Sequence, residues 1–272
     1  MIEPRSLAHS KPHHVRDLVR AGQWVGLTTG LALGYVQANL AILPGSLAED
    51  FKRFCLSNPK PMPLLDVTAP GDPVPRRVAP DADLRTDLPK YRVYVQGHLD
   101  HESSDIRDIW QPDMVGFLLG CSFSTEARLL KAGIRLRNIE LGQNEPVFRT
   151  SLACVPSRYF HGPLVVSMRP IESDKVQLAT QISEEYPLAH GGPVHVGDPN
   201  VIGIRDLRDP EWGNPIDLLP NEVAVFWACG VTPQAAIQEC QPEIAITHAP
   251  GHMFVTDLTD DEIRGVVELI KS

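Results

Sequence analysis

Apolar residues recur at helical spacing near the start of the chain. In residues 12–21 and again in residues 47–55, apolar side chains fall on one face of a predicted helix. Residues 27–43 are the most apolar stretch, but they are too short and too often interrupted by polar residues for a membrane span. Glycine recurs there every fourth residue, a spacing that lets another backbone approach closely. We therefore expect a buried helix over residues 27–43.

Shorter apolar runs predict strands in the middle of the chain. A proline- and aspartate-rich connection over residues 70–89 is long for a compact domain and marks a candidate domain boundary. A mainly helical region is expected over residues 104–132. The block from 91 to 169 could then be an inserted α+β subdomain. The strands predicted in this part of the chain are residues 64–67, 91–95, 147–154 and 164–168.

From residue 171 onward, predicted strands and helices alternate. Two of the strands are continuous apolar runs, as expected where both faces of a sheet are covered. The alternation predicts an α/β fold, a layered α/β sandwich built from residues 1–90 together with 170–272, with residues 91–169 as the smaller inserted α+β subdomain. The elements predicted after residue 171 are helices at 176–186, from 233 and from 260, and strands at 201–204, 223–228 and 244–247.

Composition and charge narrow the class of protein. The 272 residues are 43% hydrophobic and 22% charged, close to a globular average, so disorder and coiled coil are poor interpretations. The 25 prolines predict many rigid loops. A net charge of −9 without a cluster of Lys and Arg argues against nucleic-acid binding. The five cysteines show no paired spacing and follow no signal peptide, which favours reduced thiols in a cytoplasmic protein.

The turn after the strand at 223–228 is the first candidate for chemistry. Cys229 and Gly230 end the strand, and Thr232, which a proline follows, is a good N-cap for the next helix. Free N–H groups at that helix end would attract a carboxylate or phosphate and lower the pKa of the Cys229 thiol, and Gln234 could add an amide. The alternative is a buried structural cysteine before an ordinary capped helix.

A second turn of the same kind spans residues 120–126. It places Cys121, Ser122 and Ser124 ahead of an apolar helical pattern. A helix cap would account for one hydroxyl, but it does not account for the neighbouring thiol and both serines together. We therefore treat this turn as a second candidate site.

Histidines supply candidate acid–base groups. His190 and His195 lie in a glycine-rich loop that would let a ligand approach closely, and imidazole is the commonest acid–base group near neutral pH. Their spacing matches no established zinc motif, so we expect no cofactor and keep a divalent metal as the lesser alternative. His248 and His252 follow a predicted strand and could instead satisfy backbone groups in a tight turn.

Three polar side chains lie in otherwise apolar segments. Ser167 and Arg169 are at the end of a predicted strand, where the guanidinium could hold a carboxylate through two hydrogen bonds. Arg169 could equally be tied to a structural Asp or Glu. The amide of Asn39 needs a partner, which either a ligand or the backbone could supply. The GxGxxG, P-loop, HExxH and GxSxG signatures are absent, which weighs against the common cofactor and hydrolase classes.

In combination, several segments resemble the D-glutamate cyclase family, whose bacterial single-domain members are also described as hydro-lyases. The resemblance implies a lyase that adds or removes water on a three-layer α/β domain with a smaller α/β part. D-glutamate and 5-oxo-D-proline are the pair for which the family is named. The segments that carry the resemblance are residues 37–39, 63–66, 87–91, 120–124, 166–170, 190–195, 203–204 and 226–234.

The resemblance and the polar turns together give a working hypothesis. Arg169 and the helix after Cys229 would hold the carboxylates of a small carboxylic or amino acid, and His190 or His195 would move the proton. The rival is a non-catalytic carboxylate-binding or regulatory protein that uses the same crevice. We expect no nucleic-acid or membrane partner, and the chain could form a homodimer. The predicted catalytic residues are His190, His195, Cys229 and Cys121, and the predicted substrate-binding residues are Ser122, Ser124, Ser167, Arg169, Thr232, Gln234 and Asn39.

Overall fold

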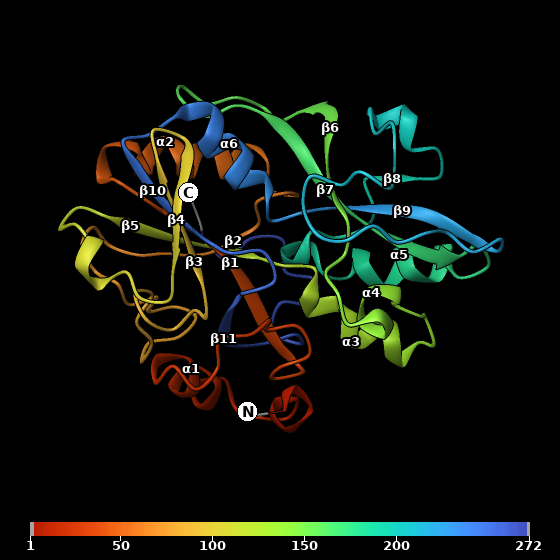
Figure 1. Ribbon diagram of the computed structural model, residues 1–272, viewed down its shortest axis with the longest axis horizontal. Helices are drawn as coiled ribbons and strands as arrows, with labels where there is room; N and C mark the ends of the chain where they lie inside the picture. The colour runs from red at the N-terminus through yellow and green to blue at the C-terminus, as the bar shows by residue number, and fades with distance from the viewer. Residues whose placement is uncertain (1–2, 271–272) are drawn as a thin grey trace.

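The computed structural model describes residues 3–270 and places two β-sheets side by side (Figure 1). All the strand pairings in both sheets are antiparallel within these residues. The larger sheet runs β2 (Leu64–Val67), β5 (Val115–Gly120), β1 (Tyr35–Leu43), β10 (Ile244–His248), β3 (Tyr91–Val95) and β4 (His98–Ser103), with β11 (Phe254–Thr259) also paired to β1. The smaller sheet runs β6 (Val147–Ala153), β7 (Pro163–Glu172), β9 (Glu222–Ala228) and β8 (His195–Val196).

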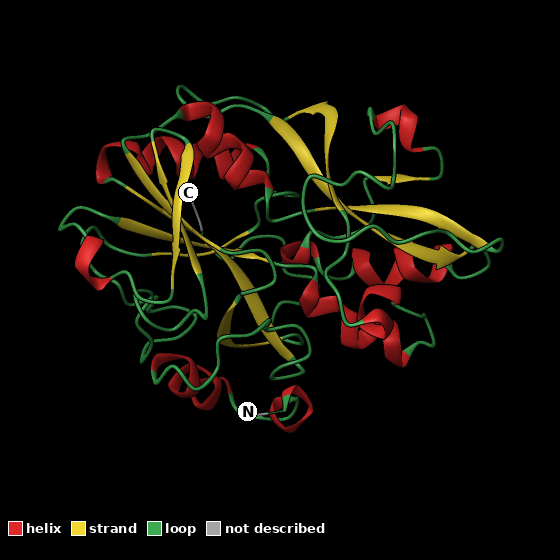
Figure 2. Cartoon of the chain, in the orientation of Figure 1, coloured by secondary structure: helices red, strands yellow, loops and turns green. Residues whose placement is uncertain are grey.

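Helices pack on the faces of both sheets (Figure 2). The α/β fold class predicted from the sequence is confirmed. The α-helices are α1 (Pro12–Arg20), α2 (Gly45–Ser57), α3 (Phe123–Lys131), α4 (Arg137–Leu141), α5 (Val176–Glu184) and α6 (Thr232–Cys240), and the short 3-10 helices are η1 (Pro4–Leu7), η2 (Arg107–Ile109), η3 (Pro187–Ala189) and η4 (Pro199–Ile202). Among residues 3–270, no helix combines the length and apolar character that a membrane crossing requires.

Strand β1 is the centre of the larger sheet, and it corrects the expectation of a helix over residues 27–43. Its side chains alternate: Leu40 and Ile42 face one hydrophobic cluster, and Ala41 and Leu43 face another. Because both faces are covered, every position after Tyr35 is buried, and polar and apolar residues alternate only from Val36 to Leu40 before an apolar run to Leu43. So short an alternation within a long apolar stretch did not distinguish the strand from a buried helix.

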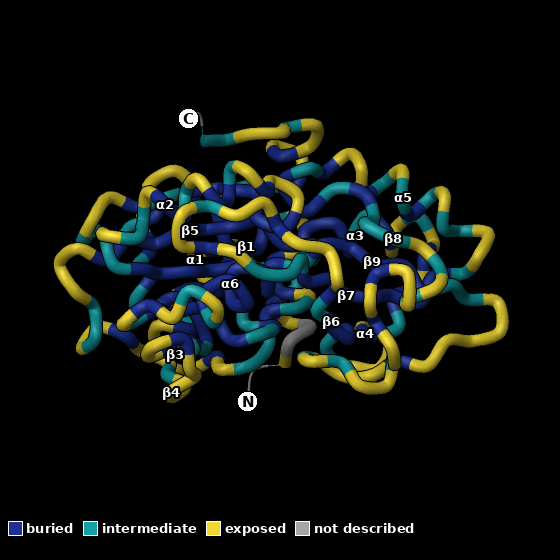
Figure 3. Tube along the Cα trace, turned by 90° about the horizontal axis from the view of Figure 1, so that it is seen from above, coloured by how far each residue is buried: buried dark blue, intermediate teal, exposed yellow. Residues whose placement is uncertain are grey.

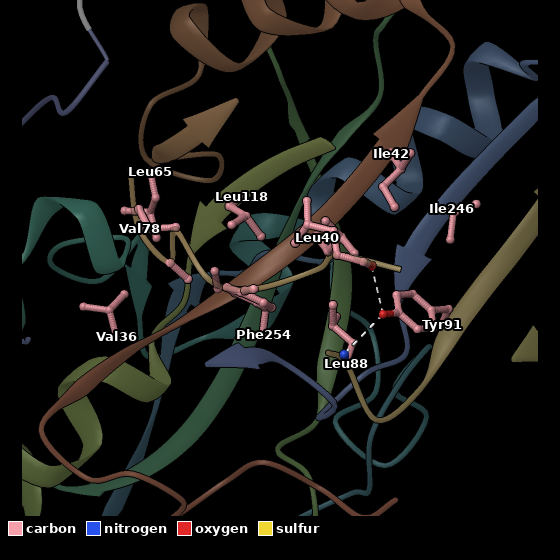
Figure 4. Close-up of a cluster of buried hydrophobic side chains, with 14 of the residues drawn as sticks. Val36, Leu40, Ile42, Leu65, Val78, Leu88, Tyr91, Leu118, Ile246 and Phe254 are labelled. Atoms are coloured by element: carbon pink, nitrogen blue, oxygen red, sulfur yellow. Dashed lines mark hydrogen bonds between the residues drawn. The ribbon is translucent and has the colours of Figure 1, made fainter. Parts of the chain in front are cut away.

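The long connection over residues 70–89 covers one face of the larger sheet. Figure 4 shows Val78 and Leu88 from this connection packed with Leu40, Leu118 and other residues of the strands. The Tyr91 hydroxyl donates to the carbonyl of Leu84 (2.8 Å) and accepts from the N–H of Leu88 (3.2 Å), which pins the connection to β3. The segment that suggested a domain boundary is therefore part of the main hydrophobic core.

The two sheets also divide the chain differently from the predicted insertion of residues 91–169. Strands β3, β4 and β5 belong to the larger sheet, whereas β8 and β9 belong to the smaller one. The chain leaves the larger sheet after β5 and returns with β10, and these two strands are the neighbours of β1 on its opposite edges. The segment between them, residues 121–243, contains all four strands of the smaller sheet.

Three further predicted elements differ from the structure. Residues 104–132, expected to be mainly helical, contain the buried strand β5 before α3. The strand expected at residues 201–204 is replaced by η4. Residues 260–270, where a terminal helix was expected, form turns after β11. The helices expected at 12–21, 47–55, 176–186 and from 233, and the strands expected at 64–67, 91–95, 147–154, 164–168, 223–228 and 244–247, are confirmed with boundaries shifted by a few residues.

The strands of both sheets form the buried interior, and most exposed residues lie in loops around them (Figure 3). Strand β4 is the exception, since its residues are almost all exposed at the edge of the larger sheet. On the smaller sheet, α3 and α5 pack over Ile171 and Val225 on one face, while η4 packs with Met168 and Phe226 on the other. Strand β5 ends beside the first half of β1, since Gly120 pairs with Ala38.

Gly120→Ala tests how tightly the end of β5 is packed. A Cβ at this position would overlap the backbone carbonyl oxygen of Leu188, which cannot rotate away as a side chain could. We expect the free energy of unfolding to fall by about 3 kcal/mol, the upper end for overpacking. Gly26→Ala is the control, because its Cβ would only contact the Trp24 ring at 3.4 Å. Equal stability of the two variants in urea unfolding would contradict the packing described here.

Candidate functional site

A small cavity lies where the two sheets meet, and residues of both sheets line it. The space open to the centres of water molecules is about 40 Å³, and one water needs about 10–15 Å³ by this measure. The cavity therefore has room for about three water molecules or for a small ligand group. The cavity is lined by Asn39 from β1, by residues 121–123 and 229–231 from two turns, by Asn144, Glu145 and Val147, by Trp212 and Gly213, and by His248, Pro250, Gly251 and Met253.

The cavity exists because two strands share one edge of β1. Strand β10 pairs with Ala41 and Ile42, whereas β11 pairs with the first half of β1, and the loop between them leaves Leu40 without a strand partner on that edge. The Leu40 N–H donates instead to Nδ1 of His248 at 3.2 Å. Nδ1 also lies 3.4 Å from the Leu40 carbonyl. We assign the proton of the neutral imidazole to Nε2, because the contact with the N–H is the shorter one and only an unprotonated Nδ1 can accept it. His248 therefore offers the cavity an N–H donor.

His248 is held as a neutral imidazole. It is almost fully buried, and burial lowers its pKa to about 4, with the nearby backbone carbonyl of Leu40 opposing this shift. Its backbone carbonyl accepts a hydrogen bond from the Gln234 amide at 3.1 Å. Gln234 was predicted to bind substrate, but its side chain supports the loop that carries His248, and it does not line the cavity.

Two turns of the same construction face the cavity. In each turn a buried strand ends at a cysteine and a helix begins two or three residues later: β5, Cys121 and α3 in one, and β9, Cys229 and α6 in the other. In each turn, the backbone N–H of the residue two positions after the cysteine lies against the thiol. Two helix N-termini, each the positive end of a helix dipole, therefore converge on one cavity.

Thr232 stabilises the second turn, but it lies one position further into the helix than the predicted N-cap position. Helix α6 begins at Thr232 itself, so the residue is the first of the helix and not its N-cap. Its hydroxyl donates to the carbonyl of Cys229 (2.8 Å) and accepts from the N–H of Val165 (3.2 Å). Thr232 was predicted to bind substrate, but these contacts with the backbone are structural.

The thiols are neutral, contrary to the expectation that the helix end would lower the pKa of Cys229. Burial raises the pKa of Cys229 to about 12, and the charge of Glu145 raises it further, against the smaller opposing effects of the Val231 N–H and Arg169. Burial also raises the pKa of Cys121 well above its usual value. Desolvation thus outweighs the helix dipole at both positions.

Arg169 lies behind the cavity in a buried cluster with two carboxylates. Its Nη2 donates to Glu126 at 3.0 Å and to Glu145 at 3.4 Å, and to the Ser122 hydroxyl at 3.2 Å, while Nη1 donates to Ser167 at 3.1 Å. The alternative in which Arg169 is tied to structural carboxylates therefore matches these contacts. Burial raises the pKa of Glu126 to about 7, with Arg169 opposing the shift and Glu145 adding to it.

Asn39 packs against the turn that contains Cys229. Its Nδ2 donates to the carbonyl of Gly120 at 2.7 Å, and a Cβ on Gly230 would overlap the Asn39 side chain. The amide therefore links the two cysteine turns, because Gly120 precedes Cys121 and Gly230 follows Cys229. This contact explains why the second turn requires glycine.

The structure brings together four of the predicted site residues, namely Asn39, Cys121, Ser122 and Cys229, as lining of one cavity. His190 and His195 do not line it. His190 is buried with Nδ1 at 2.8 Å from the carbonyl of Lys60, and burial lowers its pKa to about 4. His195 lies on β8 with Nε2 at 2.7 Å from the carbonyl of Asp198. Ser124 accepts a hydrogen bond from the backbone N–H of Gln37 and is also set back from the cavity.

The sequence reasoning missed Glu145, Glu126 and Trp212 as residues of this region. Glu145 stands in a short loop before β6 with no motif around it, and Glu126 looks like an ordinary first-turn residue of a helix. Only the contact of both with Arg169 reveals them. His252, the neighbour of His248, bonds its own loop at the carbonyl of Pro250 (3.0 Å). Within residues 3–270, no three His, Cys, Asp or Glu side chains are grouped as metal ligands.

Comparison with known proteins adds to this geometry. Residues 115–257 match the family model described as D-glutamate cyclase, and this range includes Cys121, Glu145, Cys229 and His248. A "Putative hydro-lyase" from Stutzerimonas stutzeri is 55% identical over 256 residues, which cover 94% of this chain and 96% of that protein. A protein of the same name from Rubrobacter xylanophilus is 55% identical over 247 residues, covering 91% and 95%.

One solved structure is also similar, at a much lower level. It is the crystal structure of a nitrogen repressor-like protein from Methanococcus jannaschii, with a TM-score of 0.39 and 12% sequence identity. The match covers 86% of this chain and 91% of that chain. A similarity of this size carries no functional argument.

The contact between Asn39 and Gly230 predicts a coupling between two substitutions. Gly230→Ala should cost about 1–3 kcal/mol of unfolding free energy through overlap, and Asn39→Ala about 1 kcal/mol through the lost hydrogen bond. The double variant should cost at least about 0.5 kcal/mol less than the sum, because removing the amide makes room for the new Cβ. Asn58→Ala, which removes another buried amide bonded to backbone carbonyls, should combine additively with Gly230→Ala. Additivity in both pairs would refute the contact.

The raised pKa of Cys229 predicts slow alkylation. Since the thiolate is the reactive form, iodoacetamide at pH 8 should modify Cys229 at least about 100-fold more slowly than it modifies free cysteine. The rate should still rise about tenfold per pH unit between pH 8 and 9.5, because the thiol titrates only at about 12. Peptide mass spectrometry measures the rate, with the protein unfolded in urea as the reference. A rate that levels off below pH 9 would show that the pKa is not raised.

Proposed function

The chain belongs to the D-glutamate cyclase family, and from this premise we propose that it is a hydro-lyase whose substrate is a small carboxylic or amino acid bound in the cavity between the sheets. The names of its relatives describe the same class of reaction. One observation carries the proposal: two helix N-termini, each opening after a cysteine, face a single carboxylate, Glu145, across a small enclosed space. Such a site holds an anion beside both a proton acceptor and proton donors.

The helix N-termini would hold the carboxylate of the substrate. Within the described residues, the N–H of Gly230 donates to no protein acceptor, so it is available to a ligand oxygen. The start of α3 supplies the same positive end from the other side. In this proposal Arg169 does not touch the substrate, because its guanidinium is already bonded to two carboxylates and two hydroxyls.

Loss of water requires a base and an acid on the reacting groups. Glu145 is the carboxylate that lines the cavity, and it would accept the proton from carbon or from an attacking amine. The carbon–oxygen bond then breaks, and the departing hydroxide takes a proton from a neighbouring donor to leave as water. A thiol whose pKa is about 12, such as Cys229, is still a much stronger acid than water, whose pKa is about 15.7.

His248 is the second proton donor in this proposal. Its Nε2–H is the form favoured by the hydrogen bond from Leu40, and a neutral imidazole can polarise a substrate oxygen without carrying charge. Proton transfer, which the sequence pattern assigned to His190 and His195, is thus reassigned to residues that line the cavity. D-glutamate is the first substrate to test, because closure of its amine onto its side-chain carboxyl releases one water.

Glu145→Gln is the direct test of this proposal. The protein is incubated with D-glutamate and with a panel of small hydroxy and amino acids, and mass spectrometry detects a product that has lost one water. We expect the amide to reduce turnover by at least about 100-fold, since it cannot accept the proton. Glu140→Gln, which alters an exposed glutamate paired with Arg135, should leave turnover unchanged.

Two results would overturn the assignment. Turnover of Glu145→Gln at the rate of the unaltered protein would exclude Glu145 as the base. Thermal stabilisation by carboxylic acids with no product from any of them would favour the non-catalytic carboxylate-binding alternative.

A further inference from the structure

We propose that Glu126 and Glu145 share one proton around Arg169, that Glu126 holds this proton near neutral pH, and that Glu126 is thereby a positioning residue that keeps Glu145 ionised toward the cavity. The inference rests on the proposed function only in calling Glu145 the base. The sharing of the proton follows from the geometry of three buried side chains.

The first step is that both carboxylates reach the same atom. Glu126 lies 3.0 Å and Glu145 lies 3.4 Å from Nη2 of Arg169. The side chains are 3% exposed for Arg169, 6% for Glu126 and 9% for Glu145, so solvent screens this cluster weakly. Two carboxylates on one guanidinium leave a net negative charge in a buried place. Two such acids that share a site cannot both ionise easily, and one of them keeps its proton.

Within residues 3–270, Arg169 is the one cation that pairs with Glu126 and Glu145. The titratable groups that act on it from neighbouring elements are Cys121, Cys229 and His190. Burial raises the pKa of Cys229 to about 12 and lowers that of His190 to about 4, and it raises that of Cys121 as well, so all three are neutral near pH 7. The other donors around the cluster are neutral hydroxyl and amide groups, Ser122, Ser167 and Asn138. The excess charge can therefore be removed only by a proton.

The position of the two acids decides which of them holds the proton. Glu145 lines the cavity, whereas Glu126 lies on α3 behind it and does not. The deeper acid loses more hydration when it ionises, so it is the better holder of the proton. The raised pKa of Glu126 agrees with this order. A proton on Glu126 leaves Arg169 to stabilise the ionised form of Glu145, which is the form that a base requires.

Infrared spectroscopy of the ligand-free protein tests this inference. The carbonyl stretch of protonated carboxyl groups is followed from pH 5.5 to 8.5. Besides the titration of Asp260 at lower pH, we expect a second carboxyl to lose its proton near neutral pH, and this second signal to be absent in Glu126→Gln. Asp260→Asn is the matched control, because burial also raises the pKa of Asp260, to about 6, and its removal should leave the Glu126 signal in place.

Glu145→Gln separates a shared proton from an isolated buried acid. Without the second carboxylate, Glu126 would form a simple ion pair with Arg169, so its titration should move to lower pH by at least one unit. An unchanged midpoint would overturn the sharing. A signal that survives in Glu126→Gln but vanishes in Glu145→Gln would show that Glu145 holds the proton. That result would refute the positioning role of Glu126. None of these results depends on turnover, so they stand apart from the test of the hydro-lyase proposal.

Discussion

The hydrogen bonding along one edge of β1 is the constraint on which the site depends. Two separate strands, β10 and β11, share this edge, and the loop between them cannot continue the ladder at Leu40. A buried N–H without a partner is costly, and the His248 ring supplies the missing acceptor. The same interruption opens the cavity and orients an imidazole into it. The hydrogen bond that satisfies the Leu40 N–H and the position of the candidate catalytic imidazole therefore have one structural cause.

Charge compensation is the second constraint, and it shapes the region behind the cavity. A buried arginine needs carboxylate partners, yet Arg169 has two, one more than its charge can balance. The arrangement is not optimal for stability, because it leaves an excess negative charge in the interior. Such an excess is more typical of a site that handles protons than of a purely structural ion pair. It also adds to the effect of burial on the nearby thiols, since burial raises the pKa of both Cys121 and Cys229 and the charge of Glu145 raises it further.

Local signals in the sequence were sufficient for α1, α2, α5 and α6 and for the two cysteine turns, but they misplaced helices at residues 27–43 and 260–270 and did not reveal the partners of Arg169. The turn at Cys229 is visible because a strand, a glycine and a proline-containing helix start follow one another directly. Glu126 and Glu145 are 43 and 24 residues from Arg169, and no local pattern records those contacts. Similarly, β1 was mistaken for a helix because both of its faces are covered. The extent to which each of these side chains is buried could not be predicted from the sequence. Burial also decides the protonation state of every thiol and histidine in the region.

The repeated construction of the two turns bears on what the cavity can bind. Each turn presents a helix N-terminus and a neutral thiol, and Asn39 links them by bonding to Gly120 beside one and packing on Gly230 beside the other. The two helix N-termini are the positive ends of helix dipoles, so they attract a carboxylate without a lysine or an available arginine. The atoms of the ligand next to that carboxylate then lie in weakly screened surroundings. In this proposal Glu145 can act as the base only while its charge is not cancelled by a proton. A second acid that takes the proton in its place meets this condition, and the position of Glu126 behind Arg169 allows it to do so without occupying the cavity.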